Sequence, residues 1–228
     1  GVAWYLSVQA FLYAIFPWLL AVLKKTDTRR LRCIAAAIFC AQCFFSLAIW
    51  KAGLSGKAVF YLTYLCPLFR AGDFAISCCM GCLYHSRKEE RIPYGAFSLL
   101  ELAAVLFSGG CFFIAARQVG ALGAVAFRYN VLFTPSAVLL VWLLAVGKGV
   151  ISRLLSAKPF LWLAGLSPYG FLIHQVLIRY MELAANKLGL TAHPVVWTLT
   201  VFLLTLCLSS FYKALEHRVR KRHTQTGA

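Results

Sequence analysis

The stretch PLFRAGDF, residues 67–74, places Arg70 and Asp73 inside an otherwise apolar run. A charged side chain at the centre of a membrane helix costs roughly 2.5 to 3.5 kcal/mol on insertion scales, so such residues usually face a cavity or the protein interior. Residues three apart share a helix face and can pair. The pair either neutralises itself for insertion or forms a functional site. Pro67 and Gly72 are expected to interrupt the helix and free backbone groups for a polar pocket.

Composition assigns the chain to the membrane proteins. Of its 228 residues, 61% are hydrophobic, 15% are aromatic and only 13% are charged, which exceeds the apolar content of soluble domains. The net charge of +16 raises nucleic-acid binding as an alternative, but the 23 Lys and Arg residues lie mainly in short clusters between apolar runs. We therefore expect an all-α, polytopic membrane helix bundle with the lipid bilayer as its surroundings and no nucleic-acid partner.

Apolar runs of about 17 to 25 residues predict seven membrane-spanning segments. They lie near residues 3–23, 33–50, 58–84, 96–116, 131–147, 160–181 and 194–212. The third segment contains Pro67 and the charge pair, so it either spans once or enters first as a re-entrant or interfacial piece.

The positive-inside rule sets the predicted orientation. Sixteen of the 23 Lys and Arg residues follow the first, third, fifth and seventh predicted spans, which marks that face as cytoplasmic. We expect a multi-pass protein of the cell membrane, with a transmembrane domain over 1–216 and a basic cytoplasmic tail over 217–228. Because the chain begins at Gly1 and enters an apolar run at once, we expect it to be part of a longer protein with further helices upstream.

Few other polar groups lie within the predicted spans. His174 is either a hydrogen-bonded structural residue or a general base. Cys78, Cys79 and Cys82 have spacing that metal sites use, but no His or second cysteine pair accompanies them, so we favour apolar packing and expect no metal. Glu101, one turn into its span, is interpreted as a snorkelling or packing acid rather than a catalyst.

Four segments, in the same order and with matching spacing, resemble the acyltransferase-3 family of polytopic membrane O-acyltransferases. They are AWYLSVQ (3–9), PLFRAGDF (67–74), LAGLSPYGFLIH (163–174) and SSFYKALE (209–216). Two positions depart from the family pattern, because Gln9 stands where a Glu is frequent and Phe171 replaces the usual second Tyr. The resemblance covers nearly all of this chain and corresponds to the C-terminal two-thirds of such a domain.

The resemblance implies an enzyme that moves an acyl group, most often acetyl, from cytoplasmic acyl-CoA to a hydroxyl of an extracytoplasmic carbohydrate, as in O-acetylation of cell-envelope polysaccharides. Acyl-CoA is then the donor and no metal is required. Arg70 is expected to stabilise charge, Asp73 to orient Arg70, and His174 to act as a catalytic candidate. Residues expected to line the acceptor or acyl passage are Trp4, Ser7 and Tyr169.

The same resemblance places the family's proposed catalytic His, with its basic partner, upstream of this chain, so we expect the 228 residues alone to be inactive. Two alternatives stay open. One is a transporter or channel in which the charge pair and broken helix form a substrate pathway, although no inverted repeat is visible. The other is a degenerate acyltransferase-like protein without activity.

Overall fold

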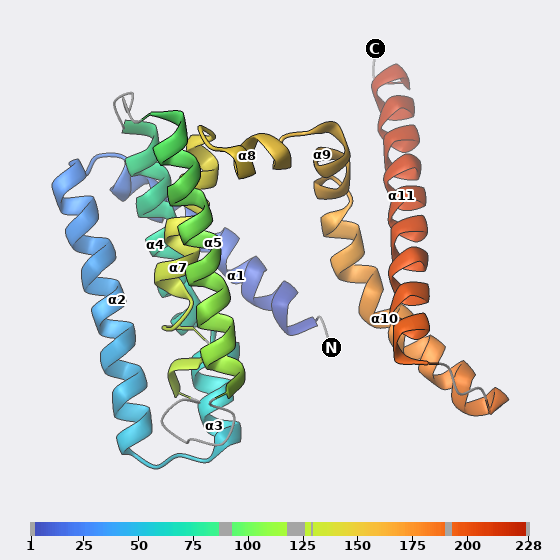
Figure 1. Ribbon diagram of the computed structural model, residues 1–228, viewed down its shortest axis with the longest axis horizontal. Coiled ribbons are helices and arrows are strands. Elements are labelled where there is room, and N and C mark those ends of the chain that lie inside the picture. Colours follow the sequence, from blue (N-terminus) through green and yellow to red (C-terminus); the bar gives the residue numbers. More distant parts are fainter. Residues whose placement is uncertain (1–2, 87–92, 118–125, 129, 190–192, 227–228) are drawn as a thin grey trace. The chain divides into compact units, whose positions relative to one another are not determined.

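The protein forms two compact units, Ala3–Leu154 and Leu155–Ala228, which are described separately. The computed structural model describes residues 3–86, 93–117, 126–128, 130–189 and 193–226. Every regular element within these ranges is helical and none is a strand (Figure 1). The predicted all-α class is therefore confirmed.

The unit Ala3–Leu154 is built from long helices of 20 to 24 residues and from shorter helices of 5 to 13 residues. The long ones are α1 (Ala3–Leu23), α2 (Thr28–Lys51), α4 (Pro67–Ser86) and α5 (Tyr94–Arg117). The others are α3 (Gly56–Phe60), the π-helix η1 (Tyr61–Leu65), α7 (Thr134–Val146) and α8 (Val150–Leu155). The starts of α2 and α5 and the end of α4 lie at one end of this unit (Figure 1).

The helix ends follow from local chemistry. Asp27 caps α2, because its side chain accepts a hydrogen bond from the Arg30 N–H at 2.7 Å. Gly147 ends α7 in the left-handed region, with φ of 74°, where a side chain would be strained. The turn between α1 and α2 is therefore tight, and α7 stops sharply.

The third predicted span is one broken helix. Residues Gly56–Ser86 are long and apolar enough to cross a membrane, but the chain passes from π-helix to extended backbone at Cys66, whose ψ is 120°. Pro67 then starts α4, because a proline fits the first turn of a helix but cannot donate a backbone hydrogen bond. The predicted break before Pro67 is thus present.

Five described helices are long and apolar enough to cross a membrane, or six if the bent pair α9 and α10 counts as one span. The fifth predicted crossing, at residues 131–147, is not confirmed. Its helix α7 has only 13 residues, about 20 Å, against a hydrocarbon layer of roughly 30 Å. The turn before it and Gly147 after it shorten the helix.

Helix α4 packs against both α2 and α1. Leu23, Leu31 and Cys79 form a buried cluster between these three helices, and Cys79 is fully buried. Cys78 and Cys82 lie at the edge of this cluster. The cysteines therefore fill the helix interface as small apolar residues, as the packing interpretation of the sequence expects.

Glu101 on α5 is fully buried and caps a different helix. Its carboxylate accepts hydrogen bonds from the N–H groups of Gly149 (3.1 Å), Ile151 (2.8 Å) and Ser152 (3.2 Å) at the start of α8. The first N–H groups of a helix have no backbone partner within it, and a negative charge is favourable at this end. The Gly149 N–H also donates to the Ser152 hydroxyl at 3.2 Å. Glu101 is therefore a packing acid, and the snorkelling alternative is wrong.

The unit Leu155–Ala228 contains α9 (Lys158–Ala164), α10 (Ser167–Leu188) and α11 (Pro194–Thr226). Helices α9 and α10 meet at 57°, and α10 packs along α11. Gly170 of α10 faces α11 at this contact, since a Cβ at that position would lie 3.5 Å from the Ser209 hydroxyl, an ordinary van der Waals distance. Helix α11 runs across the domain boundary predicted between residues 216 and 217.

The Glu101 cap predicts that Gly149 tolerates no side chain. A Cβ added at Gly149 would overlap the Glu101 carboxylate, so Gly149→Ala should lower the free energy of unfolding by about 1 to 3 kcal/mol. Thermal unfolding of the purified protein in detergent, followed by circular dichroism, measures this. Gly110→Ala on α5 is the matched control, because its Cβ meets nothing within 4 Å. Equal melting temperatures for Gly149→Ala and Gly110→Ala would contradict the role of Glu101 as a helix cap.

Candidate functional site

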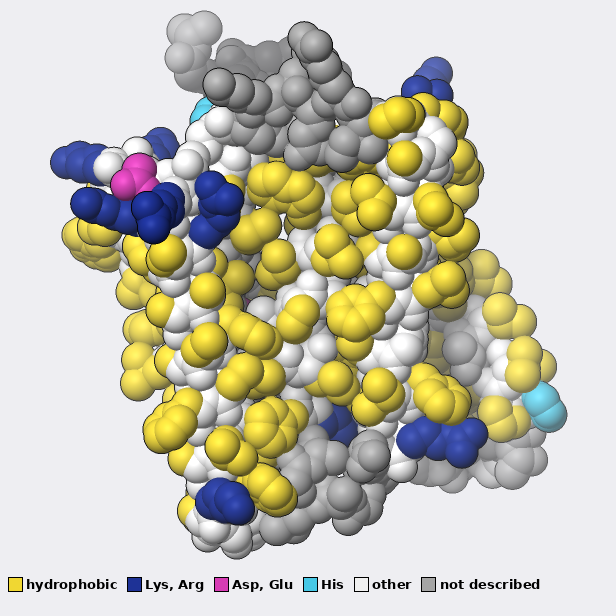
Figure 2. All heavy atoms as spheres, turned by 60° about the vertical axis from the view of Figure 1, so that its left-hand side comes forward, with side chains coloured by type: hydrophobic (Ala, Val, Ile, Leu, Met, Phe, Trp, Pro, Cys, Tyr) yellow, Lys and Arg dark blue, Asp and Glu magenta, His cyan; other side chains and the backbone are white. Residues whose placement is uncertain are grey.

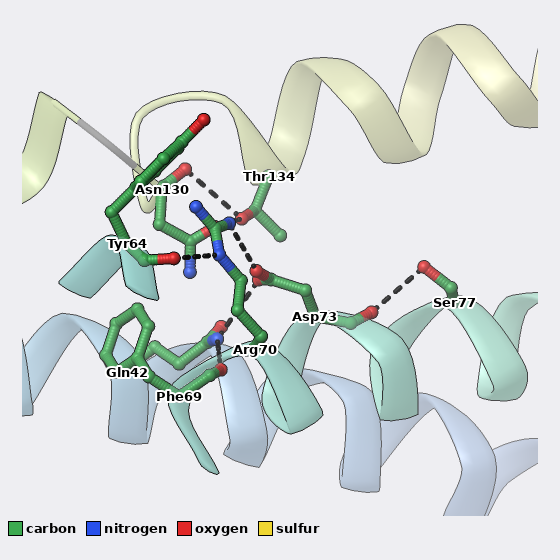
Figure 3. A network of polar contacts seen from close by, with 8 residues as sticks. All are labelled: Gln42, Tyr64, Phe69, Arg70, Asp73, Ser77, Asn130 and Thr134. Carbon is green, nitrogen blue, oxygen red and sulfur yellow. Dashed lines mark hydrogen bonds and ion pairs between the residues drawn. The ribbon is translucent and has the colours of Figure 1, made fainter. Parts of the chain in front are cut away.

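Arg70 and Asp73 form an ion pair on α4, about half-way along the broken span Gly56–Ser86 (Figure 3). Arg70 Nη1 donates to Asp73 Oδ2 at 3.1 Å. Their side chains are only 20% and 26% exposed, respectively. Partial burial makes the loss of either partner costly, because the other charge is then left unpaired, and each charge needs further hydrogen-bond partners.

The broken helix supplies one of these partners. Arg70 Nε donates to the Tyr64 carbonyl oxygen at 2.9 Å, and the guanidinium carbon lies 4.7 Å from the centre of the Tyr64 ring. In a continuous helix the Tyr64 carbonyl would bond to a later N–H, so the break at Cys66 and Pro67 is what releases it. Trp4 of α1 packs on the same ring at 5.0 Å, which places a predicted substrate-binding residue one contact away from Arg70.

Helix α2 supplies the second partner through Gln42. Its Nε2 donates to Asp73 Oδ1 at 3.1 Å and to the Phe69 carbonyl oxygen at 3.2 Å (Figure 3). The prediction that Gly72 interrupts the helix is wrong, since α4 is continuous there. Gly72 instead allows α2 to approach, because a Cβ at this position would lie 2.6 Å from Gln42 Nε2.

The ion pair lies on the wall of a cavity of about 520 Å³ between α4 and α7. The polar end of the cavity is formed by Arg70, Asp73, Asn130 and Thr134, and its other walls are mainly apolar. The cavity extends to Tyr84 of α4, which lies about 16 Å from Asp73 along that helix. The Tyr84 hydroxyl donates to the Ala145 carbonyl oxygen of α7 at 2.8 Å and ties the two helices together at this end.

Asn130 contributes an unused donor to the polar end of the cavity. The residue is only 5% exposed, and its Nδ2 has no hydrogen-bond partner among the described residues. The Thr134 hydroxyl holds the other side of the amide, at 3.4 Å from Asn130 Oδ1. A buried donor without a partner costs free energy, and a ligand carrying an acceptor oxygen would satisfy it.

Gln42, Tyr64 and Asn130 are part of this site but are not among the residues predicted from the sequence. Gln42 carries a usable signal, because it is the only amide side chain within the predicted span 33–50. Asn130 stands directly before an apolar run, which is only a weak signal in the sequence. The sequence gives no signal for Tyr64, because its role depends on its backbone carbonyl.

Two predicted site residues, Tyr169 and His174, belong to the unit Leu155–Ala228. The Tyr169 hydroxyl donates to the Glu216 carboxylate, and both residues line a cavity of about 560 Å³ with Lys213. His174 is half-buried, with Nδ1 3.1 Å from the Gly170 carbonyl oxygen. This contact requires a proton on Nδ1, which leaves a lone pair on Nε2 of the neutral ring. His174 thus has the chemistry of a base.

Of the six predicted site residues, the structure brings Arg70, Asp73 and Trp4 together in the unit Ala3–Leu154. Ser7 lies exposed on α1 of the same unit. The site can hold a ligand oxygen beside a guanidinium and an amide N–H, with apolar walls next to them. That arrangement suits stabilisation of a developing negative charge on oxygen.

Comparison with known proteins identifies a family. A family model described as an acyltransferase domain matches residues 1–213, which include all six predicted site residues. No curated protein matches the chain, and no solved structure matches it.

The network predicts a stabilising role for Gln42. Gln42→Leu keeps the size of the side chain but removes both hydrogen bonds, so the free energy of unfolding should fall by about 1 to 2 kcal/mol. Unfolding of the purified protein by added sodium dodecyl sulphate measures this. Gln175→Leu on α10 is the control of the same chemistry, because Gln175 is half-buried but belongs to the unit that does not contain Asp73. A loss no larger than that of the control would show that Gln42 contributes nothing.

Proposed function

Because the chain belongs to the acyltransferase-3 family, we propose that it transfers an acyl group, with acetyl as the expected one, from cytoplasmic acyl-CoA to a hydroxyl of an extracytoplasmic carbohydrate. The family match over residues 1–213 carries this proposal. The chain is a multi-pass membrane acyltransferase. The acyl-CoA donor, the carbohydrate acceptor and the role in modifying polysaccharides of the cell envelope are the proposed parts, as are the cell membrane and a cytoplasmic C-terminus.

The reaction joins the acceptor oxygen to the acyl carbon and breaks the carbon–sulphur bond of the thioester. A base takes the hydroxyl proton, the alkoxide oxygen attacks the thioester carbonyl, and negative charge develops on the carbonyl oxygen. The coenzyme A thiolate leaves and takes up a proton. His174 is our candidate base within this chain, on the strength of its Nε2 lone pair.

Arg70 is the proposed oxyanion donor. Its guanidinium has five N–H donors, and the described structure uses Nε for Tyr64 and Nη1 for Asp73. Nη2 makes no bond to a described residue, although it belongs to a side chain on the cavity wall. Asp73 and Tyr64 therefore hold the guanidinium in a fixed orientation, and Asn130 Nδ2 supplies a second donor at the same end of the cavity.

The transporter and the degenerate protein are the rival functions. Both require that no labelled acyl group be attached to carbohydrate, whereas the proposed enzyme attaches it covalently. The discriminating experiment is transfer of radiolabelled acetyl from acetyl-CoA to extracytoplasmic carbohydrate in membranes that contain the full-length protein. Absence of transfer at normal expression, with the cognate acceptor present, would contradict the acyltransferase proposal.

Loss of the Arg70 side chain should abolish this transfer. Removal of a single oxyanion donor typically lowers kcat by a factor of about 10² to 10³. We therefore expect Arg70→Ala to lower the rate of transfer in the radiolabel assay by at least this factor. Arg70→Lys tests the chemistry with the charge kept, because Lys still neutralises Asp73 but lacks the planar set of donors. Arg117→Ala, at the end of α5, is the matched control. Full activity of Arg70→Ala at normal membrane level would refute the role.

The unused amide of Asn130 should matter for catalysis and not for folding. Asn130→Ala removes the Nδ2 donor without adding a charge at this buried position, so kcat should fall by about 10- to 100-fold. Thermal stability should change little, because Nδ2 has no partner among the described residues and the Thr134 hydroxyl keeps its bond to the Asn130 backbone carbonyl oxygen at 3.3 Å. Asn186→Ala, exposed on α10, is the matched control. An unchanged kcat would show that Asn130 takes no part in catalysis.

A further inference from the structure

A basic cluster, separate from the Arg70 site, lies where α1 ends and α2 begins. Five cationic side chains fall within nine residues of sequence: Lys24, Lys25, Arg29, Arg30 and Arg32. The one acid among them, Asp27, caps α2 and pairs with Arg30 at 3.4 Å. The other four cations make no ion pair with a described residue. Figure 2 shows this cluster as dark-blue side chains around a single acidic one, at one end of an apolar face.

A cavity of about 640 Å³ lies directly beside this cluster, between α1, α2 and α4. Its mouth is polar and carries Lys24 of the cluster, together with Asp27 and His85. Its inner wall is apolar and is formed by Phe16, Leu20, Leu31, Cys78 and Cys82. The cavity therefore offers a cationic group and an apolar channel to the same ligand.

The depth of the apolar wall matches one leaflet of a bilayer. Phe16 and Lys24 are eight residues apart along α1, which corresponds to about 12 Å of helix. Half of a typical hydrocarbon layer is roughly 15 Å thick. A ligand with its charge at Lys24 would thus extend an apolar chain along Cys78 and Cys82 to about the middle of the bilayer.

We propose that this cavity is a binding site for an anionic phospholipid. The phosphate lies against Lys24 and the basic cluster, and one acyl chain occupies the apolar wall between α1 and α4. Charge complementarity selects the headgroup, because four cations without described acidic partners face the water at the end of the helices. Basic pockets between membrane helices on the cytoplasmic side bind anionic headgroups by this chemistry, and the cluster follows the first predicted span on that side.

Coenzyme A also carries phosphates and is the rival occupant. It differs in having no long apolar tail joined directly to its phosphate, so the apolar wall favours the phospholipid. Inorganic phosphate carries the charge alone. Competition by these two molecules therefore separates a lipid site from a simple phosphate site.

Native mass spectrometry of the full chain in detergent tests the site. Dioleoyl phosphatidylglycerol should stay bound, and dioleoyl phosphatidylcholine, with the same chains, should bind at least fivefold less. Lys24→Gln should lower phosphatidylglycerol retention by about fivefold, the effect of one basic residue at a membrane surface. Lys57→Gln, on α3, is the charge-matched control and should leave retention unchanged.

Three results would overturn the proposal. The first is equal retention of the two lipids, and the second is equal loss in the Lys24 and Lys57 variants. The third is displacement of phosphatidylglycerol by coenzyme A or inorganic phosphate at similar concentration, which would make the mouth a phosphate site without a lipid. Lys24 is exposed, so its replacement leaves the fold intact and the comparison interpretable.

Discussion

The cost of charge in hydrocarbon governs the unit Ala3–Leu154. An Arg and an Asp near the middle of a span persist only if they are paired and gain further hydrogen-bond partners. The structure meets this requirement with three helices: α4 carries the pair, α2 contributes Gln42, and η1 contributes a backbone carbonyl. The close packing of α2 on α4 gives Asp73 its partner Gln42, and the break before Pro67 gives Arg70 its partner, the Tyr64 carbonyl oxygen.

Much of the fold could be predicted from the sequence, because apolar run length is a direct consequence of bilayer thickness. Residues 3–23, 33–50, 58–84, 96–116 and 194–212 all fall in helices that can span. The segment 131–147 shows the limit of this argument. Hydropathy averages over a window and does not register that a turn at Asn130 and a left-handed Gly147 leave a short helix. Gly72 shows another limit, since a glycine that breaks a helix and one that admits a neighbour look alike in sequence.

Some residues of the candidate site could likewise be predicted from the sequence, and others could not. Arg70 and Asp73 could be found from the sequence, because charges in a span are conspicuous and their spacing fits one helix face. Gln42 and Asn130 are brought to them from 28 residues before and 60 residues after Arg70 by helix packing, which no local pattern encodes. The role of Glu101 also depends on tertiary structure. From the sequence, an acid near the end of a span can be a snorkelling residue, and only its contacts with the start of α8 identify it as a helix cap. The six predicted site residues keep the status of predictions until variants are assayed.

The length of α7 bears on how a sugar and a thioester could meet across a membrane. A helix of about 20 Å is about 10 Å shorter than a hydrocarbon layer of roughly 30 Å, so its two ends cannot both lie at the faces of that layer. At least one end of α7, either the turn at Asn130 or Gly147, must then lie below a face. In the proposed reaction, a polar end of this kind would shorten the apolar distance that the acceptor or the acyl group has to cross.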